Sequence, residues 1–260
     1  MSRRIDNFVA VKKYQSSITP DEIKELPVVG FEGRIVIVDT PEGLERACEE
    51  LMKCDVVGFD TETRPSFKAG VSYNVSLVQL STEKVCYLVR LCSMRMEKPL
   101  LKLLESKEVL KVGVDVVGDI RNLCKLRHFR AGGFVELQQE VGAFGIEDRS
   151  LRKMAAIILG VGVSKAQRLS NWEAKEMTSA QLRYAATDAW VCLEMYRRLF
   201  GDGVHSPKVD VFSQPKTVDP KSEAPKGDSP VGEEGKTSAR KRRRPHRNRK
   251  RVKQIQSDND

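Results

Sequence analysis

The chain has 260 residues, a formal net charge of +9 and 40% hydrophobic residues, which is enough apolar material for a packed core in one large or two small domains. It contains no run of 18 or more apolar residues, and its first residues, MSRRIDNF, lack the apolar stretch of a signal peptide, so we expect neither membrane insertion nor secretion. The six cysteines form no CxxC pair, and we expect reduced thiols in an intracellular, cytoplasmic protein.

Residues 1–28 are expected to form an N-terminal extension that packs on the main domain. The sequence Thr19-Pro20-Asp21-Glu22 matches a helical capping box with proline at the first helical position. We therefore predict one short helix in this extension.

Residues 29–200 show the alternation of strand and helix patterns that is typical of an α/β domain. Strands are expected at residues 34–38, 55–60, 75–80, 85–91 and 109–112, and helices at residues 41–53, 97–105, 115–126, 150–159 and 179–200. The third and fourth strands are separated by only four residues and should form an antiparallel hairpin beside parallel strands. The pattern predicts a mixed sheet flanked by helices.

The composition changes at residue 201. Residues 201–260 are rich in Pro, Ser, Gly and charged residues, and such a segment buries too little apolar surface to offset chain entropy, so we predict a disordered tail. Residues 236–253 hold eleven Lys or Arg and no acid. Five of them are consecutive: Arg240, Lys241, Arg242, Arg243 and Arg244. A basic block of this kind solubilises or targets a protein, or tethers it to a polyanion by counterion release. We favour a tether to nucleic acid or another polyanion, which is compatible with a nucleoid-associated or nuclear location.

Two acids end an apolar run in the sequence VVGFDTET, residues 56–63. Residues two apart in a strand point to the same face, so Asp60 and Glu62 should extend together from the strand end. Like charges held side by side repel unless they share a proton or a cation, and carboxylate oxygens suit hard divalent cations such as Mg²⁺. Either these acids bind a metal or TETRP is only a polar loop.

A third acid lies on the predicted last helix. Thr178-Ser179-Ala180-Gln181 forms a capping box, and the helical period places Asp188 on a largely apolar ridge with Tyr184 one turn earlier. A buried acid is rarely left unpaired. Asp188 therefore has an ion-pair partner, is partly exposed, or binds a ligand together with Tyr184.

A fourth acid follows the strand at residues 109–112. Asp119 falls in the first turns of the next helix, beside its apolar stripe, whereas Asp115 suits the helix N-terminus, where negative charge is favourable. We regard Asp119 as the stronger site candidate of the two.

The three motifs together resemble those of the DEDDy 3′-to-5′ exonucleases, a branch of the ribonuclease H-like superfamily. The matching residues are FDTET at 59–63, Lys111-Val112-Gly113 with Asp119 after five more residues, and Tyr184 with Asp188 after three more. The segments KAQRLSNW at 165–172 and AATDA at 185–189 also look like the branch of ribonuclease D and the Werner-type exonuclease domains. The similarity runs from about Val28 to Phe200.

This resemblance implies a ribonuclease H-like fold and hydrolysis of nucleic acid from its 3′ end to nucleoside 5′-monophosphates. It implies that Asp60, Glu62, Asp119 and Asp188 hold two Mg²⁺ or Mn²⁺ ions and that Tyr184 orients the attacking water. Two such ions, ~4 Å apart, activate a water and stabilise the leaving oxygen. Lys165, Arg168 and Trp172 are candidates for contacts to nucleic acid. These motifs do not encode contacts to the 2′-OH, so DNA and RNA both stay open as partners.

Two other interpretations of the sequence stay open. FDTET has a passing likeness to the nucleophile motif of haloacid-dehalogenase-type phosphatases, with Gly201-Asp202-Gly203 and Asp210 standing for the later acidic motif. The fold is also compatible with a nucleic-acid-binding module that has no turnover.

Overall fold

The computed structural model of the protein describes residues 14–203 and 205–210. They form a six-stranded mixed sheet with the strand order β2-β5-β4-β3-β6-β7. The strands are β2 (Arg34–Val38), β3 (Val56–Thr63), β4 (Val75–Ser81), β5 (Val85–Arg90), β6 (Leu110–Gly113) and β7 (Phe134–Glu136). β3, β4 and β5 pair antiparallel, and β2, β6 and β7 add to them in parallel. This is the predicted mixed sheet, including the hairpin of β4 and β5.

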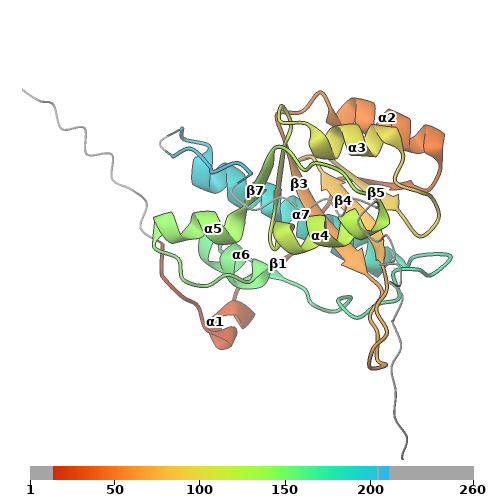
Figure 1. The fold of residues 1–260 in the computed structure, drawn as a ribbon. Coiled ribbons are helices and arrows are strands. Elements are labelled where there is room, and N and C mark those ends of the chain that lie inside the picture. The colour runs from red at the N-terminus through yellow and green to blue at the C-terminus, as the bar shows by residue number, and fades with distance from the viewer. Residues whose placement is uncertain (1–13, 204, 211–260) are drawn as a thin grey trace, which may run out of the picture. The chain divides into compact units, whose positions relative to one another are not determined.

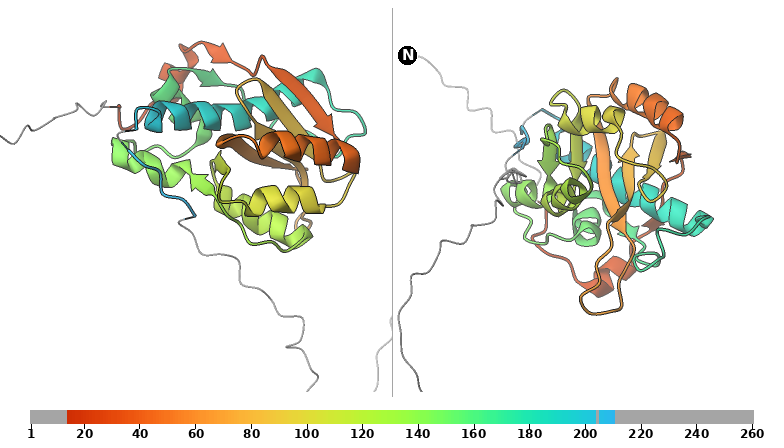
Figure 2. Two further views of the ribbon diagram at one scale, coloured as in Figure 1. Left: turned by 90° about the horizontal axis from the view of Figure 1, so that it is seen from above. Right: turned by 45° about the vertical axis from the view of Figure 1, so that its right-hand side comes forward.

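Helices cover both faces of this sheet. One face carries α2 (Pro41–Leu51), α3 (Lys98–Glu105) and α4 (Val116–Leu126), and the other carries α7 (Ser179–Phe200). The left view of Figure 2 shows the sheet between these two layers. The remaining helices are α1 (Pro20–Lys24), α5 (Leu137–Glu140), the 3-10 helix at Val141–Phe144 and α6 (Leu151–Leu159). A second, two-stranded sheet pairs β1 (Val28–Val29) with β8 (Gly162–Val163). Among the described residues, none of these helices is long and apolar enough to span a membrane.

The longest helix, α7, packs closely on the sheet because small residues line the contact. Ala185, Ala186 and Ala189 are fully buried, and a Cβ atom added to Gly58 of β3 would lie 1.9 Å from the carbonyl oxygen of Ala189. The helix begins with the predicted capping box, in which Thr178 and Gln181 bond each other's backbone nitrogens. Local sequence and tertiary packing thus fix both the start of α7 and its depth against β3.

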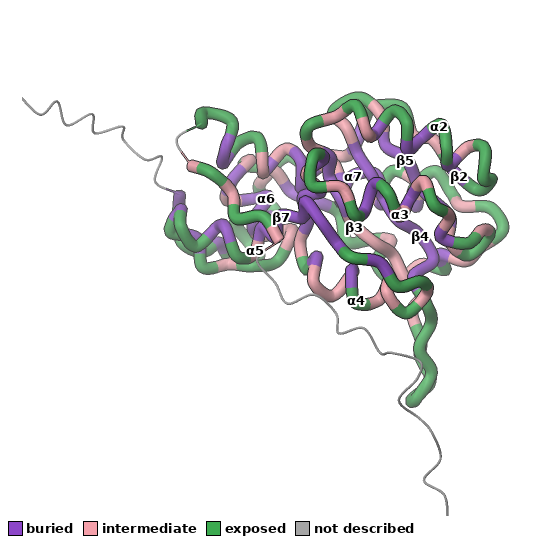
Figure 3. Tube along the Cα trace, turned by 45° about the horizontal axis from the view of Figure 1, so that its top comes forward, coloured by how far each residue is buried: buried purple, intermediate pink, exposed green. Residues whose placement is uncertain are grey.

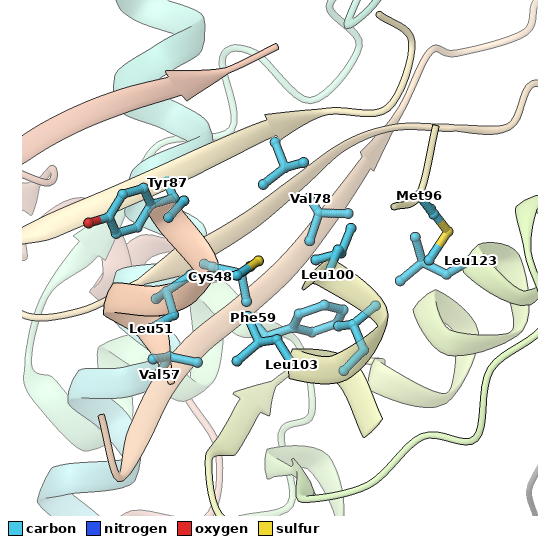
Figure 4. Packing of buried hydrophobic residues seen from close by; sticks show 14 of the residues in the cluster. Cys48, Leu51, Val57, Phe59, Val78, Tyr87, Met96, Leu100, Leu103 and Leu123 are labelled. Carbon is cyan, nitrogen blue, oxygen red and sulfur yellow. The ribbon is translucent and has the colours of Figure 1, made fainter. Parts of the chain in front are cut away.

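The core between the sheet and the helices α2, α3 and α4 is built on alternate residues of β3 and β4. Figure 4 shows Val57, Phe59 and Val78 packed against leucines from α3 and α4. Because alternate residues of a strand point to opposite faces, Gly58, Asp60 and Glu62 face α7 instead. Burial of Val57 and Phe59 therefore sets the direction in which the two acids point.

The described part of the chain also contains structure at positions for which no element was predicted. β1, β7 and β8 have two or three residues each, too few for a periodic pattern to show. The helix expected at 115–126 begins at Val116, with Asp115 as its N-cap. Beyond α7, Asp210 accepts hydrogen bonds from the backbone nitrogens of Gly133 and Phe134, both at 2.9 Å. The basic residues predicted to form a tether lie outside the described residues.

Candidate active site

The first two acids lie on the part of β3 that extends beyond the end of its neighbour β6. β3 pairs with β6 only over residues 56–58, because β6 ends at Gly113 and the chain turns into α4. On its other side, β3 stays paired with β4 to its last residue. Asp60 and Glu62 follow Gly58 on the face that contacts α7. Their carboxyl groups therefore lie between α7 and a gap in the sheet.

Asp188 of α7 completes a group of three acids. One carboxylate oxygen from each of Asp60, Glu62 and Asp188 lies within 4.8 Å of the others. Asp188 is buried, with 6% of its surface exposed, and the other two are half-buried. The ion pairs found among the described residues include none of these three acids. In the part of the chain that the structure describes, no lysine or arginine therefore forms an ion pair with the cluster.

Asp119 approaches the cluster from the opposite face of the sheet. It lies in the first turn of α4, and its Oδ1 accepts a hydrogen bond of 2.5 Å from the hydroxyl of Thr61. Thr61 stands between Asp60 and Glu62 in β3 and points to the α4 face, as Phe59 does. The structure thus brings three of the four predicted acids into one group and holds the fourth against the same strand.

The start of α4 is held by a buried glutamate that the sequence analysis missed. Glu136, at the end of β7, accepts hydrogen bonds from the backbone nitrogens of Asp115 (3.2 Å), Val116 (2.7 Å) and Gln138 (3.1 Å). Asp115 itself has a left-handed backbone, with φ of 61°. The sequence feature that could have indicated Glu136 is an acid directly after two apolar residues, Phe134 and Val135. Glu136 fixes the helix turn from which Asp119 projects.

Electrostatics within the cluster favour protonated carboxyl groups. Burial raises the pKa of Asp60 to about 7, and burial together with the charges of Asp60, Asp188 and Asp119 raises the pKa of Glu62 to about 10. Burial, and then the charge of Asp60, also raises the pKa of both Asp119 and Asp188 well above the ordinary range. Acids with strongly shifted pKa values are typical of functional sites. A cation bound to this cluster would take the place of the protons.

Tyr184 lies beside Asp188 as the helical spacing predicted. Its hydroxyl group donates a hydrogen bond to Asp188, and burial followed by the charge of Asp188 raises the pKa of this hydroxyl. The ring of Trp172 packs near that of Tyr184, with centroids 6.0 Å apart. The prediction that Trp172 contacts nucleic acid needs correction, because its side chain is 0% exposed. It is a core residue whose ring packs beside the tyrosine ring.

The other candidate contact residues lie at the surface. Lys165 and Arg168 are exposed on the loop between β8 and α7, and a pocket of about 300 Å³ separates this loop from α7. Tyr184 and Asp188 line the pocket together with Arg183. Arg240, Lys241, Arg242, Arg243 and Arg244 lie outside the described residues.

The phosphatase interpretation does not fit this geometry. Asp202 follows the end of α7, fourteen residues beyond Asp188, which corresponds to about 20 Å along a helix axis. The carboxylate of Asp210 accepts hydrogen bonds from the backbone at the start of β7. Neither residue joins the acid group around Asp60.

The donor set of the cluster suits a divalent cation. It consists of hard carboxylate oxygens gathered within 4.8 Å, and such oxygens are the preferred ligands of Mg²⁺ and Mn²⁺. Within residues 14–203 and 205–210, no basic side chain forms an ion pair with this group. Asp60, Glu62 and Asp188 could therefore hold a cation directly, with Asp119 beside them.

Comparisons with known proteins identify the family of the chain. The profile of the 3′-5′ exonuclease family matches residues 35–201. The bifunctional 3′-5′ exonuclease/ATP-dependent helicase WRN of Mus musculus is 34% identical over 195 residues, covering 71% of this chain and 14% of that protein. A 3′-5′ exonuclease of Arabidopsis thaliana is 27% identical, covering 76% of this chain and 74% of its own length.

Solved structures show the same fold. The crystal structure of the Aedes aegypti Nibbler EXO domain superposes with a TM-score of 0.59 and 25% sequence identity, covering 65% of this chain and 88% of that one. The mixed sheet with helices on both faces is thus the ribonuclease H-like arrangement that was predicted. On the matched profile, the chain belongs to the 3′-5′ exonuclease family.

Proposed function

We propose that the protein is a metal-dependent exonuclease that hydrolyses nucleic acid from the 3′ end and releases nucleoside 5′-monophosphates by a two-metal-ion mechanism. The observation that carries this proposal is the convergence of Asp60, Glu62 and Asp188 within 4.8 Å. Asp119 accepts a hydrogen bond from Thr61, the residue between Asp60 and Glu62 in β3. Membership of the 3′-5′ exonuclease family supports the direction of attack.

Each residue of the cluster has a chemical role in this proposal. Asp60, Glu62 and Asp188, with Asp119 beside them, would hold the divalent cations. Divalent cations bound there would lower the pKa of a water molecule and offset the negative charge that develops on the phosphate. The Tyr184 hydroxyl, next to Asp188, orients the attacking water by hydrogen bonding. This mechanism needs no covalent nucleophile from the protein.

Exposed side chains around the cluster suit a polyanionic substrate. Lys165 and Arg168 are exposed on the loop before α7, whose residues Ala166 and Gln167 line the pocket beside Asp188. The loop after β3 projects from the same end of the sheet (Figure 1). Residues 66–74 of this loop are exposed (Figure 3); Phe67 is 83% exposed and is followed by Lys68. Aromatic rings stack on bases and basic side chains neutralise phosphates, whether the substrate is DNA or RNA.

The experiment is a cleavage assay on a 5′-labelled single-stranded oligonucleotide in Mg²⁺ and in Mn²⁺. We expect stepwise shortening by the wild-type protein and loss of at least about 10³-fold in rate for Asp60→Ala or Asp188→Ala, since each removes a ligand on which the chemistry depends. Circular dichroism spectra of the variants should match those of the wild type. Lys107→Ala, an exposed change next to α3, serves as the matched control. Shortening that persists in both aspartate variants would contradict the proposal, and binding without cleavage would favour a non-catalytic module.

A further inference from the structure

Gln79 is a buried polar residue whose amide group has no hydrogen-bond partner among the described residues. It lies near the middle of β4 and is 0% exposed, and neither its Nε2 nor its Oε1 atom is bonded. Leaving a buried amide unpaired destabilises a fold. An apolar side chain of similar size would fill the same space without this penalty, so the presence of the amide calls for an explanation outside core packing.

The position of Gln79 is next to the acid cluster. In the register of β3 and β4, Gln79 stands directly opposite Asp60, so the two side chains share one face of the sheet, with Cβ atoms about 5 Å apart. α7 covers this face. On the other side of Gln79, its partner in β5 is the apolar Leu88. Asp60 is therefore the polar cross-strand neighbour of the unpaired amide.

A nearby buried donor does not account for this amide. Trp172 lies in the apolar cluster on the same face, with Leu77 and Leu88, and its Nε1 is also unpaired. An indole N–H only donates hydrogen bonds, so it gives the amide nitrogen of Gln79 no acceptor. Of the two cross-strand partners of Gln79, only Asp60 offers a side-chain acceptor for the amide nitrogen.

We propose that Gln79 is a positioning residue of the metal site, whose amide nitrogen donates to the carboxylate of Asp60 when that carboxylate binds a divalent cation. The proposal rests on the proposed function. A carboxylate that binds a cation keeps further lone pairs, and carboxylate ligands of metal sites are commonly held by hydrogen bonds from outside the ligand set. The amide fixes the orientation of Asp60 toward the face it shares with Glu62 and Asp188.

The test is Mn²⁺ binding to Gln79→Met by isothermal titration calorimetry without nucleic acid, so that turnover plays no part. Methionine has about the same length and no donor. We expect the apparent Kd for Mn²⁺ to rise about 10- to 100-fold, the usual effect of losing an outer hydrogen bond to a metal ligand. In EDTA, the variant should melt at or above the wild-type temperature, because an unpaired buried amide has been removed.

Leu88→Met is the matched control, a volume-conserving change beside Gln79 on the same face, and it should leave Mn²⁺ affinity unchanged. Wild-type affinity in Gln79→Met overturns the proposal, as does an equal loss in Leu88→Met. Gln79→Leu is a second replacement without a hydrogen-bond donor. If neither variant folds, the amide is required for folding of the metal-free protein, and the proposal is also wrong. A wild-type protein that binds no Mn²⁺ and releases no nucleotide refutes the proposed function instead.

Discussion

Individual carboxyl groups determine how this protein responds to pH. Asp60 and Glu62 are held where burial and neighbouring acids raise their pKa to about 7 and about 10. The unfolded chain would ionise them near pH 4. Between these values the folded state binds more protons than the unfolded state, so the free energy of unfolding falls as pH rises. At neutral pH the cluster therefore lowers the free energy of unfolding of the metal-free protein.

We predict that, in EDTA, the melting temperature falls as pH is raised from 5 to 7. Lys111 opposes this fall only as the pH approaches 7, because burial lowers its pKa to about 7 and the unfolded state then holds the lysine proton more tightly than the folded state. Thermal denaturation across the range measures the effect. Glu62→Gln should flatten the dependence, and saturating Mn²⁺ should raise the melting temperature most at pH 7. A melting temperature that rises with pH in EDTA would show that the acids are not buried together.

At the residue scale, the sequence predicts those site residues whose relative positions follow from their spacing along one strand or one helix. The DxE spacing placed Asp60 and Glu62 on one face, and the helical period placed Tyr184 beside Asp188, as the structure shows. Gln79 and Thr61 were not found, because their importance depends on which residue lies opposite Asp60 in β4 and on where α4 meets β3. Such pairings arise from register and tertiary packing, which a single sequence does not encode directly.

At the scale of elements, the site depends on how closely α7 lies against β3. Asp188 reaches Asp60 because Gly58 and three alanines let the helix backbone approach the strand. The long periodic pattern of α7 and the apolar run of β3 made both elements predictable. Their separation was not predictable, since it is set by the absence of a Cβ atom at one position.

Gly58→Ala should push α7 away from β3, because the new methyl group would lie 1.9 Å from the carbonyl oxygen of Ala189. We expect a loss of about 1–3 kcal/mol in the free energy of unfolding, which is typical of overpacking, together with weaker Mn²⁺ binding. Urea denaturation and calorimetry measure the two effects.

Gly162→Ala in β8 is the control for this prediction. Its nearest atom would be 3.5 Å from the added Cβ atom, an ordinary van der Waals distance, so stability should change by less than about 1 kcal/mol. If both substitutions had the same small effect, close packing of α7 on β3 would not be what holds the acids together.

At the scale of the whole chain, excess positive charge lies at a distance in sequence from the acid cluster. Residues 236–253 carry eleven basic residues and no acid, whereas the cluster gathers buried acids. A basic segment of this kind would raise the local concentration of a polyanion near an acidic site. The segment lies outside the described residues, so its role stays a prediction from composition.

Deleting residues 211–260 tests that role while keeping the hydrogen bonds of Asp210. We expect weaker binding of a single-stranded oligonucleotide in Ca²⁺ and a smaller dependence of log K on log salt, by about 0.7 for each phosphate that the tail no longer neutralises. Nucleotide release per bound substrate should change little. Fluorescence anisotropy across a salt series measures both quantities, and equal affinities and slopes for the two proteins would rule out the tether.

The chemical identity of the first product distinguishes hydrolysis from the 3′ end at the acid cluster from other nuclease reactions. An oligonucleotide labelled in its 3′-terminal nucleotide is incubated with the protein in Mn²⁺, and the products are separated by chromatography. We expect label to appear first as a nucleoside 5′-monophosphate, and we expect EDTA or Asp188→Ala to prevent its release. Release of 3′-monophosphates or internal fragments, or release that continues in EDTA, would contradict it.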